Sequence, residues 1–268
     1  IIGPAILGSI ILQDADTITA SITGMSEAQK AVVLDGLASK VIVPYIVIAA
    51  LLVIVAIAIY YSKLPEPEMD AEEGEATSYS AGKTSILQFP HLLLGVFTLF
   101  IYVGVEVIAG NTIAGYGAFL GIPYTYTKFF TSLTLAGMFV GYIIGISLIP
   151  KYLSQEKALR ISSLLGVAFV LLAIFTNGQA SVLFIALLGL ANSLMYPAIW
   201  PLALKDVGRF TKTASTLLVA AIVGGAVLPL VYGALADAFD QRHAYWMVIP
   251  CYLIIAFYAF KGYKIRIK

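Results

Sequence analysis

The chain has 268 residues, of which 60% are apolar and 12% are charged. Soluble domains are about 45–50% apolar and about 25% charged. This composition, with a mean hydropathy of +0.94, therefore excludes an ordinary soluble fold and a disordered chain. The 16 basic and 15 acidic residues nearly cancel, so the chain has no excess of positive charge with which to bind nucleic acid. The composition indicates a membrane protein.

A membrane-spanning helix needs about 20 mostly apolar residues, and seven stretches of the chain meet this requirement. They are 41–61, 91–122, 128–149, 158–176, 180–204, 213–236 and 243–262. Residues 1–12 are apolar but too short to cross, and we interpret them as the end of a helix whose beginning precedes this sequence. We predict an all-α, multi-pass membrane protein that is incomplete at its N-terminus.

The positions of lysine and arginine test this arrangement, because loops on the cytoplasmic side carry an excess of both. If residues 62–90 are cytoplasmic and each span reverses the direction, twelve of the 16 basic residues lie inside. The four on the outside are Lys30, Lys40, Lys128 and Arg242. This asymmetry predicts a multi-pass protein in contact with the lipid bilayer, with a cytoplasmic C-terminus.

The segment Leu64–Gly82 (LPEPEMDAEEGEATSYSAG) has a different composition, with prolines, an acidic run and small polar residues. It cannot bury enough apolar surface to fold alone, so we interpret it as a flexible linker. We predict three parts: residues 1–61 as the end of one bundle (part of a helix, an outer loop and a further helix), 62–90 as a cytoplasmic linker, and 91–268 as a six-helix bundle. Two six-helix bundles joined by a linker are a common transporter plan.

Glu106 is the one charged residue deep within a predicted span. Such residues are costly in lipid and are functional candidates. Tyr102 lies one helical turn before it on the same face. Glu106 is therefore a candidate ligand for substrate hydroxyls or a coupling cation, and the alternative is a protonated carboxyl bonded to a neighbouring helix. The 91–122 stretch is longer than the bilayer requires, which predicts strong tilt or a break near Gly110 and Asn111.

Asn192, Tyr196 and Trp200 recur every four residues in 180–204 and so fall on one helical stripe. An amide and two amphipathic aromatics suit a sugar, which has hydroxyl edges and apolar faces. The alternative is helix packing, because Asn and Tyr also form hydrogen bonds between membrane helices. The candidate sugar ligands are therefore Tyr102, Glu106, Asn111, Asn192, Tyr196 and Trp200.

Glycines mark two further spans. Gly137, Gly141 and Gly145 recur every fourth residue, which favours close packing against another helix. Gly224 and Gly225 lie before Pro229 in the middle of 213–236, and we predict that they, like Gly110, form a hinge or line a cavity, with simple packing as the alternative.

Catalytic motifs are scarce in the sequence. The two histidines, His91 and His243, lie at opposite membrane faces in this topology and cannot share a metal, so we predict no enzyme, no metal and no cofactor beyond a coupling ion, H+ or Na+. Two alternatives stay open. A seven-span receptor would explain the span count, although a retinal pigment needs a lysine deep in a span. A membrane enzyme acting on a lipid or glycan would need a polar cluster near one face, such as Asp237, Asp240 and Arg242.

Four stretches resemble the fucose permease and glucose/galactose transporter family of the major facilitator superfamily. They are YVGVEVIAG (102–110), LLGLANSLMYPAIWPLAL (187–204), GRFTKTAST (208–216) and AIVGGAVLPLVYGALAD (221–237). The resemblance runs from Gln88 to the end. It implies that residues 91–262 are helices seven to twelve of a twelve-helix permease of the bacterial plasma (inner) membrane. Such a permease imports a monosaccharide by H+ or Na+ symport through alternating access.

The resemblance also implies roles for single residues. Glu106 takes the polar site of the seventh helix, where fucose permeases have glutamine, so its role stays open between sugar ligand and coupling group. Asn192, Tyr196 and Trp200 match the tenth-helix stretch that faces the central cavity, and Gly224 and Gly225 match the bend of the eleventh helix. The family's acidic residues on helices one and four have no counterpart here, so the missing N-terminal half of the polypeptide is the expected partner.

Overall fold

The structure is a computed structural model that describes residues 2–11, 17–18, 21, 25–62 and 79–266. These residues are helical and form no strands. The α-helices are α1 (Ile2–Ile11), α3 (Glu27–Tyr61), α4 (Pro90–Phe119), α5 (Tyr124–Thr127), α6 (Phe130–Leu148), α7 (Gln155–Phe175), α8 (Gly178–Asn192), α9 (Met195–Leu204), α10 (Thr211–Ala220), α11 (Gly224–Ala238), α12 (Gln241–Ala244) and α13 (Val248–Phe260).

Seven helical segments of the described chain are long and apolar enough to cross a membrane. Each of them coincides with a span predicted from the sequence. The predicted spans 180–204, 213–236 and 243–262 are each formed by two α-helices in succession, α8–α9, α10–α11 and α12–α13. The all-α prediction is therefore confirmed.

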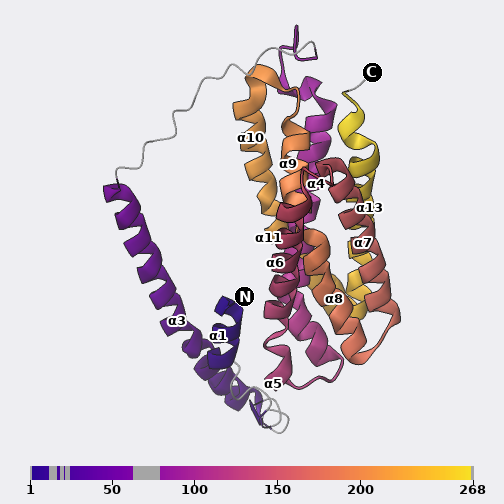
Figure 1. The fold of residues 1–268 in the computed structure, drawn as a ribbon. Coiled ribbons are helices and arrows are strands. Elements are labelled where there is room, and N and C mark those ends of the chain that lie inside the picture. Colours follow the sequence, from indigo (N-terminus) through magenta and orange to yellow (C-terminus); the bar gives the residue numbers. More distant parts are fainter. Residues whose placement is uncertain (1, 12–16, 19–20, 22–24, 63–78, 267–268) are drawn as a thin grey trace.

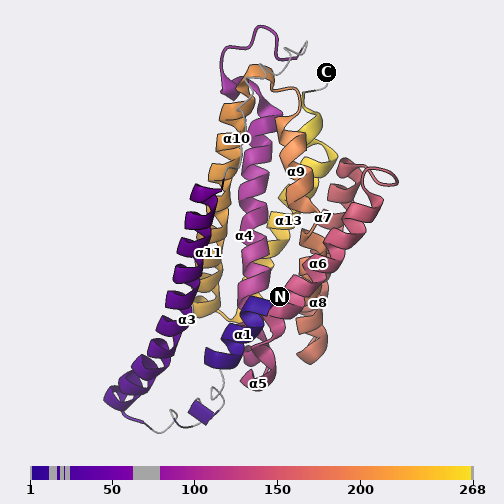
Figure 2. The same cartoon turned by 60° about the vertical axis from the view of Figure 1, so that its left-hand side comes forward.

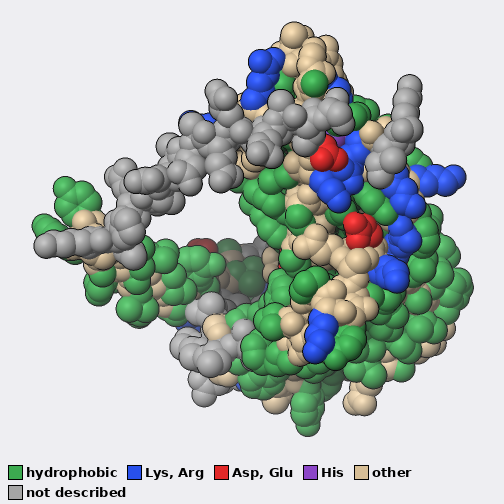
Figure 3. All heavy atoms as spheres, turned by 45° about the horizontal axis from the view of Figure 1, so that its top comes forward, with side chains coloured by type: hydrophobic (Ala, Val, Ile, Leu, Met, Phe, Trp, Pro, Cys, Tyr) green, Lys and Arg blue, Asp and Glu red, His purple; other side chains and the backbone are tan. Residues whose placement is uncertain are grey.

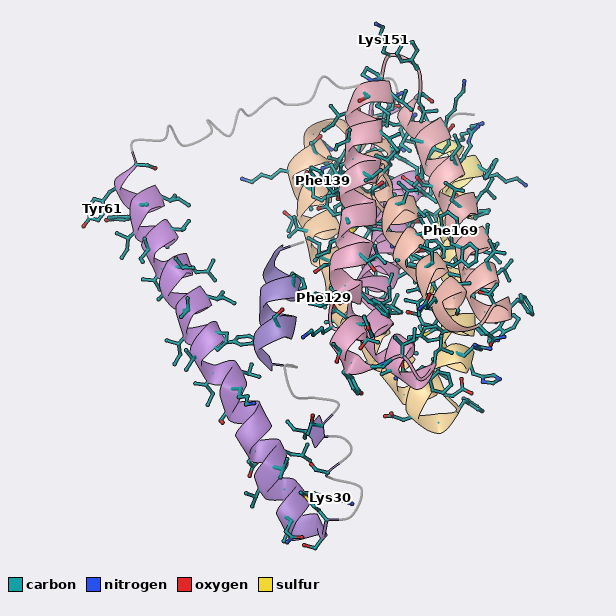
Figure 4. The ribbon with its side chains drawn as sticks, turned by 60° about the horizontal axis from the view of Figure 1, so that its bottom comes forward. Lys30, Tyr61, Phe129, Phe139, Lys151 and Phe169 are labelled. Atoms are coloured by element: carbon teal, nitrogen blue, oxygen red, sulfur yellow. The ribbon has the colours of Figure 1, made fainter. Side chains whose placement is uncertain are left out.

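Helix α3 is longer than the predicted span 41–61, because it already begins at Glu27. The extra residues include good helix formers such as alanine, lysine and glutamine. The side chain of Gln29 also accepts a hydrogen bond from the Ser26 backbone N–H at 3.1 Å, which satisfies a donor at the helix start. Part of the predicted outer loop is thus helical. Along its most apolar 18 residues α3 buries nothing in the described structure, and Tyr61 at its end lies away from the bundle (Figure 4).

Helix α4 runs through Gly110 and Asn111 without interruption, so the predicted break at this point is wrong. The neighbouring helix α6 supports the backbone here, because Thr131 Oγ1 donates a hydrogen bond to the Gly110 carbonyl at 2.8 Å. The 30 residues of α4 are about 45 Å long at 1.5 Å per residue, which exceeds the hydrocarbon thickness. Since α4 is not broken, we expect it to tilt in the membrane, which is the other predicted way to fit its length.

The helices from residue 90 onward form a bundle with α4 among the others (Figures 1 and 2). Helix α4 packs against α6, α8, α9, α11 and α13. It supplies several of the fully buried large side chains, among them Leu92, Leu99, Tyr102, Ile108 and Tyr116. By contrast, α6 is mostly exposed, and Phe139 on its outer side is 57% exposed (Figure 4).

The small-residue stripe of α6 packs against α8, as predicted. A Cβ atom on Gly141 would lie 2.0 Å from Ser193 Oγ, and one on Gly137 would lie 3.2 Å from the Ala186 carbonyl oxygen. The contact is reciprocal, because a Cβ atom on Gly189 of α8 would lie 2.0 Å from the Thr134 carbonyl oxygen. The glycines therefore allow the two backbones to approach closely.

Gly224 has a similar packing role between α11 and α4. A Cβ atom there would lie 1.9 Å from the Phe100 carbonyl oxygen, and one on Gly225 would lie 3.0 Å from Val103 Cγ1. The chain changes at this point from the 3-10 turn Ala221–Val223 into α11. The contacts of both glycines are thus those of helix packing, and their roles as a hinge or cavity lining stay predictions.

The last part of the predicted linker 62–90 packs on the bundle, whereas residues 63–78 lie outside the described residues. Phe89 is fully buried, and the ring of Tyr79 contacts the rings of Phe89 and His91. The Lys83 ammonium lies 3.2 Å from the centroid of the Tyr79 ring, and Arg209 donates a hydrogen bond to the Lys83 carbonyl at 2.8 Å. Aromatic residues at the end of the segment give it the apolar contacts that its acidic part lacks.

The same end of the bundle holds most of the described lysines and arginines, as the topology predicts (Figure 3). His91 Nε2 bonds to the Lys205 carbonyl at 2.8 Å and connects the start of α4 to the end of α9. Arg266 pairs with Asp206, whose φ of 62° places it in the left-handed region. These contacts join α4, the α9–α10 turn and the C-terminal segment.

The packing of Gly224 gives a stability prediction. We expect Gly224→Ala to destabilise the bundle by about 1–3 kcal/mol, because the new methyl group collides with the backbone of α4. The measurement is reversible unfolding of the purified protein in mixed micelles. Gly233→Ala on the same helix is the control, since nothing lies within 4 Å of its added Cβ, and we expect little change. Equal stability of the two variants would contradict this account of the α4–α11 contact.

Candidate functional site

The centre of α4 holds a carboxyl and a phenol in contact. Glu106 and Tyr102 lie one helical turn apart on the same face of α4, as their four-residue spacing predicts, and their side chains interact. Tyr102 is fully buried, whereas Glu106 is partly exposed. Tyr142 of α6 and Tyr252 of α13 lie close enough to Glu106 to interact with it electrostatically. The carboxyl thus interacts with tyrosines from three helices.

Asn192 lies at the end of α8 and bonds to two other helices. Its backbone carbonyl accepts a hydrogen bond from the Tyr102 hydroxyl at 3.1 Å, and its side-chain Oδ1 accepts one from the Tyr252 hydroxyl at 2.8 Å. Its Nδ2 is buried and has no partner among the described residues. Since Asn192 is only 1% exposed, its predicted contact with sugar stays a prediction, and the contacts described are those between helices.

Tyr196 and Trp200 lie on α9 and extend the cluster as a row of rings. The ring of Tyr196 lies 6.3 Å from that of Tyr102 and stacks on that of Trp200 at 5.7 Å. Both α9 residues are partly exposed. The predicted continuous stripe with Asn192 is interrupted, because α8 ends at Asn192 and α9 begins at Met195. Pro197 contributes to this interruption, since it has no N–H to donate to the Ser193 carbonyl.

Asn111 lies farther along α4 and is exposed. It is more than a helical turn beyond Glu106, so the structure does not bring it into the cluster of Tyr102, Glu106 and Tyr196. Its role as a sugar ligand stays a prediction, as does the hinge role of Gly110.

A second group of hydroxyls is buried toward the other end of α4. Tyr116 Oη and Ser181 Oγ lie 2.7 Å apart, and so do Thr112 Oγ1 and Tyr245 Oη. The ring of Tyr245 packs edge-on against those of Tyr116 and Tyr232. These contacts join α4 to α8 and to the start of the last span, and they are separate from Glu106.

The predicted outer charge group does not form one cluster. Arg242 donates a hydrogen bond to Asn177 Oδ1 at 2.7 Å and so ties α12 to the α7–α8 turn. Asp240 caps α12: the His243 backbone N–H donates to its Oδ1 at 2.7 Å, which lowers the pKa of the Asp240 carboxyl. In the described part of the chain, no three His, Cys, Asp or Glu side chains are grouped so that they could hold a metal ion.

Sequence reasoning missed Tyr252 and Tyr142 as members of the cluster. Tyr252 lies in an apolar run, where it looks no different from Tyr258, six residues later. The hydroxyl of Tyr252 bonds to Asn192, 60 residues away in the sequence, whereas that of Tyr258 has no hydrogen-bond partner among the described residues. Gly166 of α7 gives the Tyr252 ring its space, since a Cβ there would lie 2.4 Å from the ring.

Comparisons with known proteins place this fold in a class. The structure of the major facilitator superfamily transporter FucP in its outward conformation matches with a TM-score of 0.64 and 25% identity, over 90% of this chain and 59% of that one. The chain is 34% identical to the glucose/galactose transporter of Brucella abortus biovar 1 (strain 9-941), over 82% of this chain and 53% of the relative. It is 27% identical to the L-fucose-proton symporter of Escherichia coli K12, over 80% and 49%. No family model matches.

These comparisons confirm the predicted resemblance. The chain has the helical fold of a major facilitator superfamily transporter and is similar to glucose/galactose transporters and L-fucose-proton symporters. These relatives are transporters and not enzymes, as the sequence predicts. The chain spans about half the length of the curated relatives that it matches.

The bond between Tyr252 and Asn192 can be tested by its contribution to stability. We expect Tyr252→Phe to lower the free energy of unfolding by about 1–3 kcal/mol, because it leaves the Asn192 Oδ1 buried without its donor. Tyr258→Phe removes the same atom from a buried tyrosine of α13 that has no partner, so its effect should be close to zero. Unfolding in mixed micelles measures the stability of both variants. An equal loss of unfolding free energy in the two would show that the Tyr252–Asn192 bond contributes nothing.

Proposed function

We propose that this chain is part of a bacterial transporter that imports a monosaccharide together with a proton. The observation that carries the proposal is the Glu106 carboxyl in the middle of α4, one helical turn from Tyr102, whose ring lies 6.3 Å from the partly exposed ring of Tyr196 on α9. A carboxyl at this depth in a membrane is costly and is expected at a substrate or ion pathway. The names of the relatives, glucose/galactose transporter and L-fucose-proton symporter, support a sugar as the solute.

The helices of residues 91–268 form, in this proposal, one of two six-helix bundles that move against each other. Residues 1–61 then belong to the end of the other bundle, and 62–90 form the connection. The match to about half of each relative supports this division. A solute path between two bundles takes ligands from both, so the described cluster is one side of the binding site.

Within this side, Glu106 is the proposed coupling group, and Tyr196 and Trp200 are the proposed contacts for the sugar. Stacked aromatic rings suit the apolar face of a pyranose, and a carboxyl can accept hydrogen bonds from its hydroxyls. A proton is favoured over Na+ because the polar partners of Glu106 are phenols, which are weak cation ligands compared with carboxylates and carbonyls. The predicted cytoplasmic side is the end that carries Lys83, Lys151 and Arg209.

The proposal is tested by sugar uptake in liposomes that contain the full-length protein. We expect radiolabelled glucose, galactose or fucose to accumulate when an inward proton gradient is imposed, and not when a protonophore collapses it. Accumulation driven by Na+ alone would refute proton coupling. Absence of flux for all three sugars would refute the substrate class.

The role of Glu106 is tested in the same assay. We expect Glu106→Gln to reduce gradient-driven accumulation about tenfold, the scale of a typical coupling free energy, because glutamine cannot bind and release a proton. Exchange of sugar across the membrane without a gradient should persist. Glu156→Gln makes the same chemical change in the first turn of α7 and should leave accumulation unchanged. Equal accumulation in both variants would show that Glu106 is not the coupling group.

A further inference from the structure

Tyr102 is shared between two hydrogen-bond partners that a single hydroxyl cannot satisfy equally. Its hydroxyl donates to the backbone carbonyl of Asn192 at 3.1 Å, and the Glu106 side chain, one helical turn farther along α4, is the second partner with which it interacts. A phenol has one proton to donate and lone pairs with which to accept. Tyr102 is fully buried, so in this conformation it cannot contact a solute directly. Its hydroxyl is thus positioned to connect Glu106 to α8.

The Asn192 carbonyl, which accepts the Tyr102 hydrogen bond, lies where the helical backbone is interrupted. Asn192 is the last residue of α8, and carbonyls in the last turn of a helix have no partner within it. The chain then turns at residues 193–194 before α9 starts at Met195. The Tyr102 hydroxyl therefore caps the end of α8 at the interruption between α8 and α9.

The protonation state of Glu106 decides which way the Tyr102 proton points. When the carboxyl is protonated, its O–H donates to the Tyr102 oxygen, and the Tyr102 O–H donates to the Asn192 carbonyl. When the carboxyl has lost its proton to water in the solute path, it can only accept, and a charged acceptor forms the stronger bond. The Tyr102 O–H then turns to Glu106, and the Asn192 carbonyl loses its donor. Tyrosine keeps its proton in both states.

Among the described residues, the titratable groups that interact with Glu106 are Tyr102 on α4, Tyr142 on α6 and Tyr252 on α13. Phenols ionise only at alkaline pH. Glu106 is therefore the member of this group that can change charge without alkaline pH.

Asn192, which accepts the Tyr102 hydrogen bond, is itself held in place by a bond to α13. The Tyr252 hydroxyl bonds to Asn192 Oδ1 at 2.8 Å, which anchors the end of α8 to α13. The Asn192 Nδ2 in the same cluster is buried and without a partner among the described residues. A buried donor without a partner is costly, which is consistent with a cluster that has a second arrangement in which this donor is used.

We propose that Tyr102 is a positioning residue that transmits the protonation of Glu106 to the α8–α9 interruption. Protonation caps α8 and fixes the position of α9, which carries Tyr196 and Trp200, whereas deprotonation releases it. This inference rests on the proposed proton–sugar symport and adds the element through which the proton acts on the sugar side of the site.

The test compares Tyr102→Phe with Tyr116→Phe in the full-length protein in liposomes. Both variants remove the hydroxyl of a buried tyrosine on α4, but that of Tyr116 bonds to Ser181, away from Glu106. Sugar exchange without a gradient is measured over a range of pH, together with accumulation driven by a proton gradient. We expect Tyr102→Phe to retain exchange, to lose its pH dependence and to lose about tenfold in accumulation, the scale of a typical coupling free energy. Tyr116→Phe should behave like the parent.

The outcomes separate the two proposals. A parent protein that moves no sugar would refute the proposed function. A parent that accumulates sugar while Tyr102→Phe keeps both its pH dependence and its accumulation would overturn the role of Tyr102 alone.

A second measurement does not depend on the folding of Tyr102→Phe. Amide hydrogen exchange of residues 193–196 and 198–200, corrected for the intrinsic effect of pH, should be faster in the parent at high pH than at low pH. In Glu106→Gln it should stay slow at both, because a neutral side chain leaves Tyr102 on Asn192. Exchange in the parent that is the same at both pH values would overturn the proposal.

Discussion

A carboxyl in the middle of an apolar helix needs polar partners, and the centre of this bundle is built around that requirement. Glu106 interacts with Tyr102, one helical turn away on α4, and electrostatically with Tyr142 of α6 and Tyr252 of α13, and the Tyr102 hydroxyl also reaches the backbone of α8. Because water is absent from hydrocarbon, each such group must find its partner within the protein. The need to stabilise one carboxyl in the membrane thus links side chains and backbone from four helices.

The helices can supply these partners only because they approach closely. Glycines bring α6 against α8 and α11 against α4, and Gly166 makes room for the ring of Tyr252. In lipid there is little hydrophobic drive between helices, so close packing and hydrogen bonds hold them together. The polar cluster and the glycine contacts therefore depend on each other: the glycines set the distances at which the hydroxyl bonds form.

The sequence contains enough information for the spans and for the polar face of α4, since both follow from hydropathy and the 3.6-residue period. It also predicts the neighbouring positions of Tyr102 and Glu106. It does not distinguish Tyr252 from Tyr258, because their difference depends on which helix lies opposite. The predicted break at Gly110 failed because one glycine and one asparagine lower helix propensity only slightly, and packing of α4 in the bundle outweighs that preference. Likewise, four-residue spacing could not reveal that the backbone turns between Asn192 and Tyr196.

The anchored segment before α4 has a mechanical consequence. Tyr79, Lys83 and Phe89 attach the incoming chain to the bundle immediately before the first turn of α4, and Arg209 holds the same segment from the α9–α10 side. Any force exerted through the preceding chain is thus applied near the first turn of α4, which carries Glu106. It is also applied beside the end of α9, which carries the stacked rings of Tyr196 and Trp200. A displacement of this segment would therefore act directly on both α4 and α9.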